Sequence, residues 1–134
     1  MNTQFVECVP NFSEGRNIET INAIADAIRS VDGVRVLHID CGEAANRTVI
    51  TFVGEAHRVV EAAFCMVKRA AELIDMRHHH GEHPRIGATD VLPIIPLKGI
   101  SLSECAELAR ALAERIYKEL AIPTYCYEAA AFCP

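Results

Sequence analysis

The hydrophobic residues of this chain change their period several times, and the order of these changes limits the folds it can adopt. Short runs rich in β-branched and aromatic residues are typical of strands, whereas apolar residues three or four apart are typical of amphipathic helices. The runs predict strands over residues 4–9, 34–40, 47–53, 91–97 and 124–127. Helices are predicted over residues 17–32, 55–75 and 101–120.

The ends of the predicted helices carry recognisable signals. Asn17 has the side chain of an N-cap, and Asp32 followed by Gly33 predicts the end of the first helix. Ser101 and Glu104 have the spacing of a capping box, which predicts the start of the third helix. The apolar faces expected for the three helices are Ile18, Ile21, Ile24, Ala25, Ile28 and Val31; Val60, Phe64, Val67, Ala71 and Ile74; and Cys105, Leu108, Leu112, Ile116 and Leu120.

The strands carry signals that bear on their path. Pro10 predicts the end of the first strand, and Pro93 and Pro96 predict an edge position or an irregular path for the fourth. A loop containing Gly42 predicts a hairpin between the second and third strands. A doubly wound sheet needs a helix at that point. The order β-α-β-β-α-β therefore predicts an α+β fold of the ferredoxin-like type, with helices on one face of the sheet and an extra α-β unit.

Length and composition suit one domain over residues 1–134, because 51% of the residues are hydrophobic and can fill a core. The chain stops at Ala129–Pro134 without a polar tail or a helix stop, so we expect the parent sequence to continue. The net charge of −5 does not favour nucleic acid or an acidic membrane as a partner. No apolar run approaches the roughly 20 residues of a membrane span, and the start lacks a signal peptide, so a cytoplasmic location is expected.

The six cysteines have no Cys-x-x-Cys spacing and are scattered along predicted strands and helices. In a chain without a secretion signal, this pattern is typical of free, buried thiols. A metal cluster built from cysteines is therefore not expected.

The segment from Arg77 to Arg85 (RHHHGEHPR) holds four of the six histidines. Imidazoles titrate near neutral pH, so one of them could take up and return a proton within a single turnover. The two arginines that flank the segment could hold carboxylates through paired hydrogen bonds. Pro84 restricts the backbone of His83 towards extended geometry, which helps to aim its ring.

Two other interpretations of this segment stay open on the residues alone. His78, His80 and His83 could bind a metal, with Glu82 or Asp90 adding an oxygen ligand. Against this, the spacing is less regular than in known zinc motifs, and the nearby arginines raise the cost of binding a cation. The segment could also be a solvated loop without a site.

Two further loops are candidate binding segments. The polar residues from Asn11 to Arg16 follow a predicted strand, where ligand-binding loops are common, although a turn that caps the first helix is at least as good an interpretation. The central hairpin holds Asp40 with Asn46 and Arg47. Asp40 could orient a histidine as a carboxylate partner, although an ordinary hairpin turn is the default.

Three segments in this order, ECVPNFSEGR, ANRTVITFVG and GEHPRIGATDVLPIIP, resemble the amino-terminal subdomain of the glutamate formiminotransferase family. The resemblance extends from Glu7 to Ala131, nearly the whole chain. It implies two α/β subdomains of ferredoxin-like type with the substrates in a cleft between them. Family members continue past the position of Pro134 into the second subdomain.

The resemblance implies an enzyme that transfers the formimino group of N-formimino-L-glutamate to N5 of tetrahydrofolate, the co-substrate, without a metal. His83, in the His-Pro-Arg motif, is expected to be the catalytic base, and Asp40 to support it. The expected substrate-binding residues are Asn11, Asn46, Arg47, Arg77 and Arg85. Small-molecule substrates and a homo-oligomer are expected. The alternative is a non-catalytic folate-binding or scaffold domain that lacks the second subdomain.

Overall fold

The computed structural model describes residues 3–12, 14, 16–42, 47–73, 89–91 and 93–121 of the chain. These residues form an α+β fold with one antiparallel sheet of six strands and three helices. The elements are β1 (Phe5–Cys8), β2 (Asn11–Phe12), α1 (Ile18–Arg29), β3 (Val34–Gly42), β4 (Arg47–Glu55), α2 (Ala56–Leu73), β5 (Thr89–Val91), β6 (Ile94–Lys98) and α3 (Leu102–Leu120). Among the described residues, no helix is long and apolar enough to cross a membrane.

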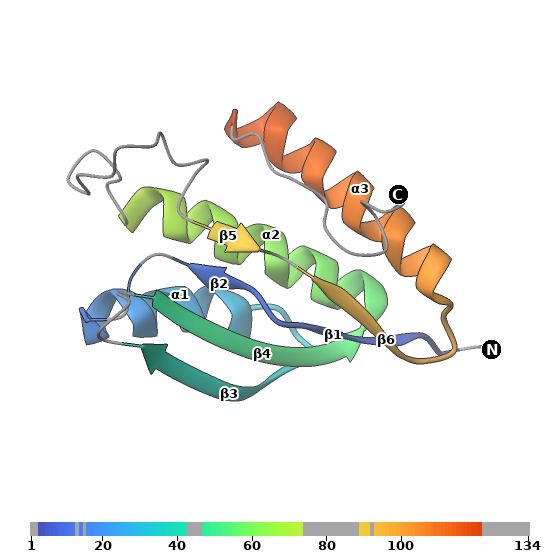
Figure 1. The fold of residues 1–134 in the computed structure, drawn as a ribbon, viewed down its shortest axis with the longest axis horizontal. Helices are drawn as coiled ribbons and strands as arrows, with labels where there is room; N and C mark the ends of the chain where they lie inside the picture. Colours follow the sequence, from blue (N-terminus) through green and yellow to red (C-terminus); the bar gives the residue numbers. More distant parts are fainter. Residues whose placement is uncertain are drawn as a thin grey trace.

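The strand β4 is the centre of the sheet (Figure 1). The edge strand β3 pairs with one side of β4. On the other side of β4, β1 pairs with one half of the strand and β2 with the other half. Further out, β6 pairs with β1, and β5 pairs with β2. All of these pairs are antiparallel.

The first strand ends before Pro10, as the sequence predicts, but a second short strand, β2, which was not predicted, follows directly after this proline. β2 resumes the register of β1 along β4, and the Pro10 carbonyl accepts a hydrogen bond of 3.1 Å from the Ile50 N–H. On the other side, the Val9 N–H donates to the Pro93 carbonyl at 3.3 Å. The prolines therefore lie where the ladder is broken, and the irregular path predicted from Pro93 is confirmed.

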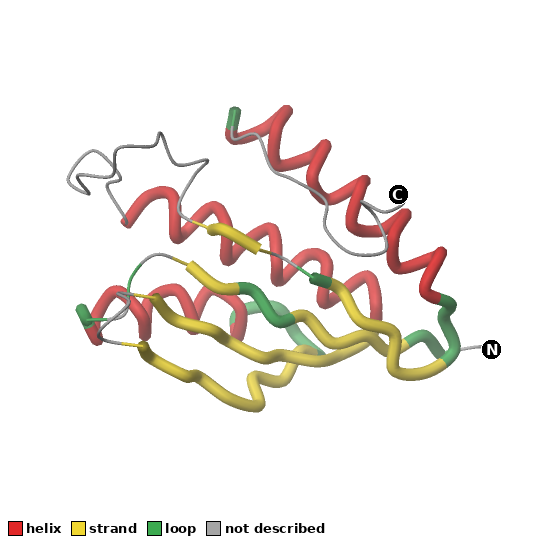
Figure 2. The backbone as a smooth tube through the Cα atoms, viewed as in Figure 1, coloured by secondary structure: helices red, strands yellow, loops and turns green. Residues whose placement is uncertain are grey.

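One face of the sheet carries the core. Along β4, the residues at every second position from Thr48 to Gly54 are buried, and those between them are partly exposed. The buried ones join residues of the helices in a single apolar cluster, which includes Phe12, Phe52 and Ile24. Figure 2 shows the strands as one continuous twisted layer with the helices packed along it. We call the opposite side, on which Arg47, Val49, Thr51 and Val53 lie, the open face.

The first helix begins as the sequence predicted. The Asn17 side chain accepts a hydrogen bond of 3.2 Å from the Thr20 N–H, which confirms the N-cap. Ile21, Ile24 and Ile28 are buried, but Ile18 is 58% exposed, so its place on the apolar face was predicted wrongly. Ile18 is the first residue of the helix.

The apolar face of α2 is wider than the stripe predicted from its sequence. α2 contacts α1, α3 and the sheet, so small side chains are buried on several sides of it. Ala71, predicted to be in the core, is exposed, and Val60 is only partly buried. Ile74 lies outside the described residues. The buried residues are Ala56, Val59, Ala62, Ala63, Phe64, Met66, Val67 and Ala70.

The capping box at the start of α3 is confirmed. The Ser101 hydroxyl accepts from the Glu104 N–H at 3.1 Å, and the Glu104 carboxylate accepts from the Ser101 N–H at 2.9 Å. The helix packs against α2 and β6 (Figure 1), so the predicted extra unit begins as expected. Its final strand, predicted over residues 124–127, lies outside the described residues.

The four described cysteines are free thiols, but not all of them are buried. Cys8 and Cys105 lie in the core, and burial raises the pKa of both. Cys65 is partly buried, whereas Cys41 is exposed on the edge strand β3, which corrects the prediction of buried thiols for that residue. Cys126 and Cys133 lie outside the described residues.

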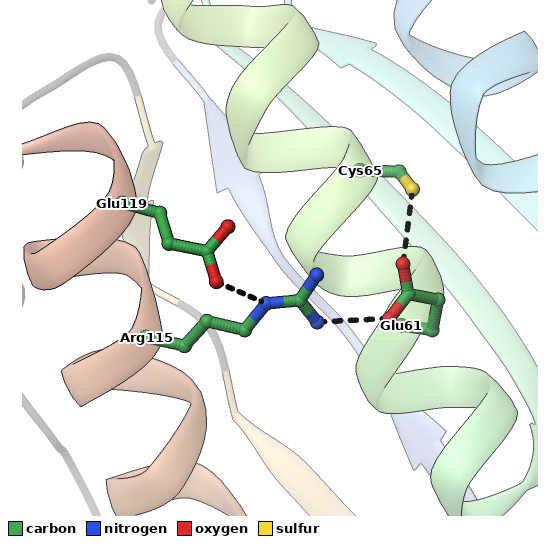
Figure 3. Close-up of polar contacts among 4 residues, drawn as sticks. All are labelled: Glu61, Cys65, Arg115 and Glu119. Atoms are coloured by element: carbon green, nitrogen blue, oxygen red, sulfur yellow. Dashed lines mark hydrogen bonds and ion pairs between the residues drawn. The ribbon is translucent and has the colours of Figure 1, made fainter.

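A charged cluster joins α3 to α2 (Figure 3). Arg115 donates to Glu61 across the two helices at 2.8 Å and to Glu119 on its own helix at 3.1 Å. Its guanidinium also lies over the Phe64 ring, 3.7 Å from the centroid. The hydrogen bond from Arg115 lowers the pKa of Glu61, although burial opposes this.

Replacing this arginine, as in Arg115→Met, is expected to lower the free energy of unfolding at neutral pH by about 0.5–1.5 kcal/mol. The pKa of Glu61 in the folded protein is below its ordinary value of 4.5. The stabilisation from the Arg115–Glu61 ion pair is therefore fully present above pH 4.5 and is lost as the pH falls through the lowered pKa. The difference in stability between the two proteins should therefore shrink in acid, as measured by urea unfolding at pH 7 and pH 3. In Lys118→Met, which removes an exposed pair with Glu114, the loss should stay below about 0.5 kcal/mol.

Candidate functional site

Three of the residues predicted to form the site are described, and they come from three neighbouring strands. Asn11 is the first residue of β2, Asp40 lies near the end of β3, and Arg47 begins β4. Asn11 was expected in a loop and is a strand residue, whereas Asp40 was predicted as the last residue of a strand and lies within β3, which continues to Gly42. The remaining predicted site residues, Asn46, Arg77, His83 and Arg85, lie outside the described residues.

Asp40 and Asn11 flank the same residue of the central strand. Val49 pairs with Asp40 on β3 and with Asn11 on β2. Directly opposed residues of an antiparallel pair point to the same face of a sheet, and neighbouring strands lie about 4.8 Å apart. The next row, with Phe12 and Thr48, is buried on the core side. Asp40 and Asn11 therefore lie on the open face, about 10 Å apart across two strand spacings.

Arg47 joins this group from the start of β4. Its Nη1 donates to the Asn11 Oδ1 at 3.3 Å. Because Arg47 is two residues from Val49 on the same strand, it also lies on the open face. The arrangement thus brings together a carboxylate, a carboxamide and a guanidinium, which can bind substrates that carry both donors and acceptors.

A β-bulge in β3 decides which way Asp40 points. Arg35 pairs with Val53 and Val36 with Phe52, after which the register shifts and His38 pairs with Thr51. Leu37 is the extra residue and is 54% exposed. Without it, the alternation of side chains would turn Asp40 to the core side. The sequence prediction did not include this bulge.

The turn between β2 and α1 is organised by Glu14, another residue that was not predicted. Its carboxylate accepts from the N–H groups of Arg16 at 3.0 Å and Asn17 at 2.9 Å. Its carbonyl accepts from the hydroxyl of Thr48, which is fully buried. These bonds tie the start of α1 to β4, so the interpretation of this segment as a helix-capping turn is confirmed for the described residues.

The described residues contain no group of three His, Cys, Asp or Glu side chains that could hold a metal ion. The histidine-rich segment is outside that search, so metal binding by His78, His80 and His83 is untested. The chain connects this segment to the open-face residues. His83 precedes Thr89 by six residues, and β5, which Thr89 begins, pairs with β2 through Phe12 and Asn11.

Residues 5–134 match the model of the family described as the formiminotransferase domain, N-terminal subdomain. The chain is 52% identical over 132 residues to the formimidoyltransferase-cyclodeaminase of Rattus norvegicus, covering 98% of this chain and 24% of that protein. It is also 52% identical over 129 residues to the glutamate formimidoyltransferase of Thermoplasma acidophilum, covering 96% of this chain and 43% of that protein.

The glutamate formimidoyltransferase of Streptococcus pyogenes serotype M1 gives a similar result, with 48% identity over 131 residues, 98% of this chain and 44% of that protein. The chain thus spans less than half the length of each of these three relatives. The family match, in contrast, extends over almost all of the chain. The chain therefore belongs to the formiminotransferase family, within which it corresponds to the N-terminal subdomain.

Proposed function

We propose that this chain forms part of a glutamate formimidoyltransferase, which transfers the formimino group of N-formimino-L-glutamate to N5 of tetrahydrofolate. The family match and the names of the relatives support the activity. Asp40, Asn11 and Arg47 lie together at one end of the open face. This observation is the reason for assigning the activity to these residues. Tetrahydrofolate is the co-substrate in this proposal.

His83 is the proposed acid–base catalyst. A chain of six residues spans at most about 20 Å, so the connection to Thr89 keeps His83 within reach of β2. Asp40 would orient its ring or stabilise the imidazolium, as carboxylates do in catalytic triads. Asn11, Asn46, Arg47, Arg77 and Arg85 are the proposed substrate-binding residues.

The proposed reaction needs one proton carrier. N5 of tetrahydrofolate attacks the amidine carbon, so that a new C–N bond forms and a tetrahedral centre results. His83 takes the proton from N5 and then donates it to the glutamate nitrogen as the bond from that nitrogen to carbon breaks. The products are 5-formiminotetrahydrofolate and L-glutamate, and the imidazole returns to its starting state.

Three further expectations concern the fold type, the cellular location and the oligomeric state. We propose that the fold is ferredoxin-like, which is supported by the order in which β1 with β2, β3, β4, and β5 with β6 lie in the sheet. A cytoplasmic location and a homo-oligomeric assembly stay predictions from the sequence.

A spectrophotometric assay with formiminoglutamate and tetrahydrofolate tests the proposal, on this chain and on the complete gene product side by side. Formation of 5-formiminotetrahydrofolate that depends on both substrates is the expected result for the complete product. A complete product that binds tetrahydrofolate but transfers nothing would contradict the proposed activity and favour the folate-binding or scaffold alternative.

A further inference from the structure

The edge strand β3 carries an arginine and a histidine that none of the proposed roles uses. Arg35 pairs with Val53 and His38 pairs with Thr51, both on the open face, and both side chains are exposed. Neither makes a hydrogen bond or an ion pair with another described residue. The two side chains are therefore available to a ligand.

The bulge at Leu37 places Arg35, His38 and Asp40 in line on one face. Their partners on β4, which are Val53, Thr51 and Val49, are two residues apart each time. Successive side chains on one face of a strand are about 6.7 Å apart, so the three follow one another at about that spacing. A guanidinium, an imidazole and a carboxylate thus lie in order along the strand, and the carboxylate is at the end where Asn11 and Arg47 lie.

We infer that Arg35 and His38 form a binding position for a carboxylate of a glutamyl group, next to the site at Asp40. A guanidinium and an imidazole are both donors to carboxylate oxygens, and the Thr51 hydroxyl opposite His38 adds a third donor. The inference rests on the proposed function, in which both substrates contain glutamate. The formimino donor suits the strand best, because its amidine cation would face Asp40 while a carboxylate faces Arg35.

Charges and a bulge on an edge strand also have a simpler use, because they keep the edge from pairing with another sheet. That use needs no ligand. The two explanations differ in what a substitution changes: loss of edge protection promotes self-association, whereas loss of a carboxylate position weakens the binding of glutamate.

Calorimetric titration of the full chain with L-glutamate separates these explanations. The double variant Arg35→Gln/His38→Asn is expected to bind glutamate at least tenfold more weakly than the unsubstituted chain, with an unchanged melting temperature. Arg58→Gln/His57→Asn is the matched control, because it removes the same two side-chain types from the exposed start of α2, and its affinity should change less than twofold. Arg35→Lys, which keeps the charge but loses the paired donors, should lie in between.

Equal affinities in both double variants, or no binding of glutamate by the unsubstituted chain, would overturn the inference. Kinetics on the complete gene product identify the source of the carboxylate. A raised KM for formiminoglutamate alone assigns it to the donor, and a raised KM only for tetrahydrofolate with several glutamyl residues assigns it to the folate tail. Glutamate binding that depends on Arg35 and His38 in a complete gene product without transferase activity would contradict the proposed function and leave this inference standing.

Discussion

Replacing the proposed catalytic base, as in His83→Ala, should lower kcat in the complete enzyme by about 10²–10⁴-fold. In the proposed mechanism, a single imidazole both removes the N5 proton and protonates the leaving glutamate nitrogen. The proposal assigns the positioning of the two substrates to other residues, so KM should change much less than kcat. Steady-state kinetics with each substrate varied in turn measures both quantities.

The matched control for this experiment is His57→Ala. His57 is an exposed histidine at the start of α2 and belongs to none of the proposed site groups. Its removal should leave kcat within a factor of two, and both variants should melt at the temperature of the unsubstituted enzyme. Turnover in His83→Ala close to that of the His57 variant would contradict the proposed role of His83. The metal-binding and solvated-loop interpretations of residues 77–85 would then be favoured.

The largest effect on stability is expected from Phe52→Ala, with a loss of about 3–5 kcal/mol in the free energy of unfolding. Phe52 is fully buried at the middle of β4 and belongs to the core cluster between the sheet and the helices. Truncating it removes a large apolar side chain and leaves a cavity. Urea unfolding monitored by circular dichroism gives the difference in stability directly.

The neighbouring variant Val53→Ala tests whether the two faces of the sheet differ as described. Val53 points to the open face and is only partly buried, so its truncation should cost less than about 1 kcal/mol. Similar losses for the two variants would mean that the face with Val53 is packed as tightly as the core. The face on which Asp40, Asn11 and Arg47 lie would then be unavailable to substrates.

Local signals in the sequence were sufficient to place the helices. Asn17 and Ser101 act through hydrogen bonds within one turn of their own helix, and both caps were predicted correctly. The width of the buried face of α2 could not be predicted in this way, because it depends on contacts with α1, α3 and the sheet. Ala71 and Ile18 were placed wrongly for the same reason, since only the tertiary packing decides where each helix meets its neighbours.

The sequence predicted which residues belong to the candidate site, but not how these residues are arranged in space. Asn11 and Asp40 meet at Val49 through strand pairings between distant parts of the chain, which no local pattern contains. One local signal was nevertheless present. In the strand sequence VRVLHID, the two successive apolar residues Val36 and Leu37 break the strict alternation of apolar and polar side chains, as expected of a bulge.

That bulge also explains why the sequence does not predict that Arg35 and His38 share a face. In a regular strand these two residues would point to opposite faces, because they are three positions apart. Glu14 and Thr48 were missed for a different reason. Their importance comes from a hydrogen bond between a turn and a buried strand position, and the residue types alone do not indicate that contact.

The central claim is that substrates bind on the open face around Val49, and methyl-labelled NMR of the full chain tests it most directly. Val49 and Ile50 are adjacent on β4 but point to opposite faces, so their methyl groups form a matched pair. Titration with formiminoglutamate and with tetrahydrofolate should shift the Val49 methyl signals and leave those of the fully buried Ile50 nearly unchanged. Shifts confined to the core and the helices, with Val49 unmoved at saturation, would contradict the account.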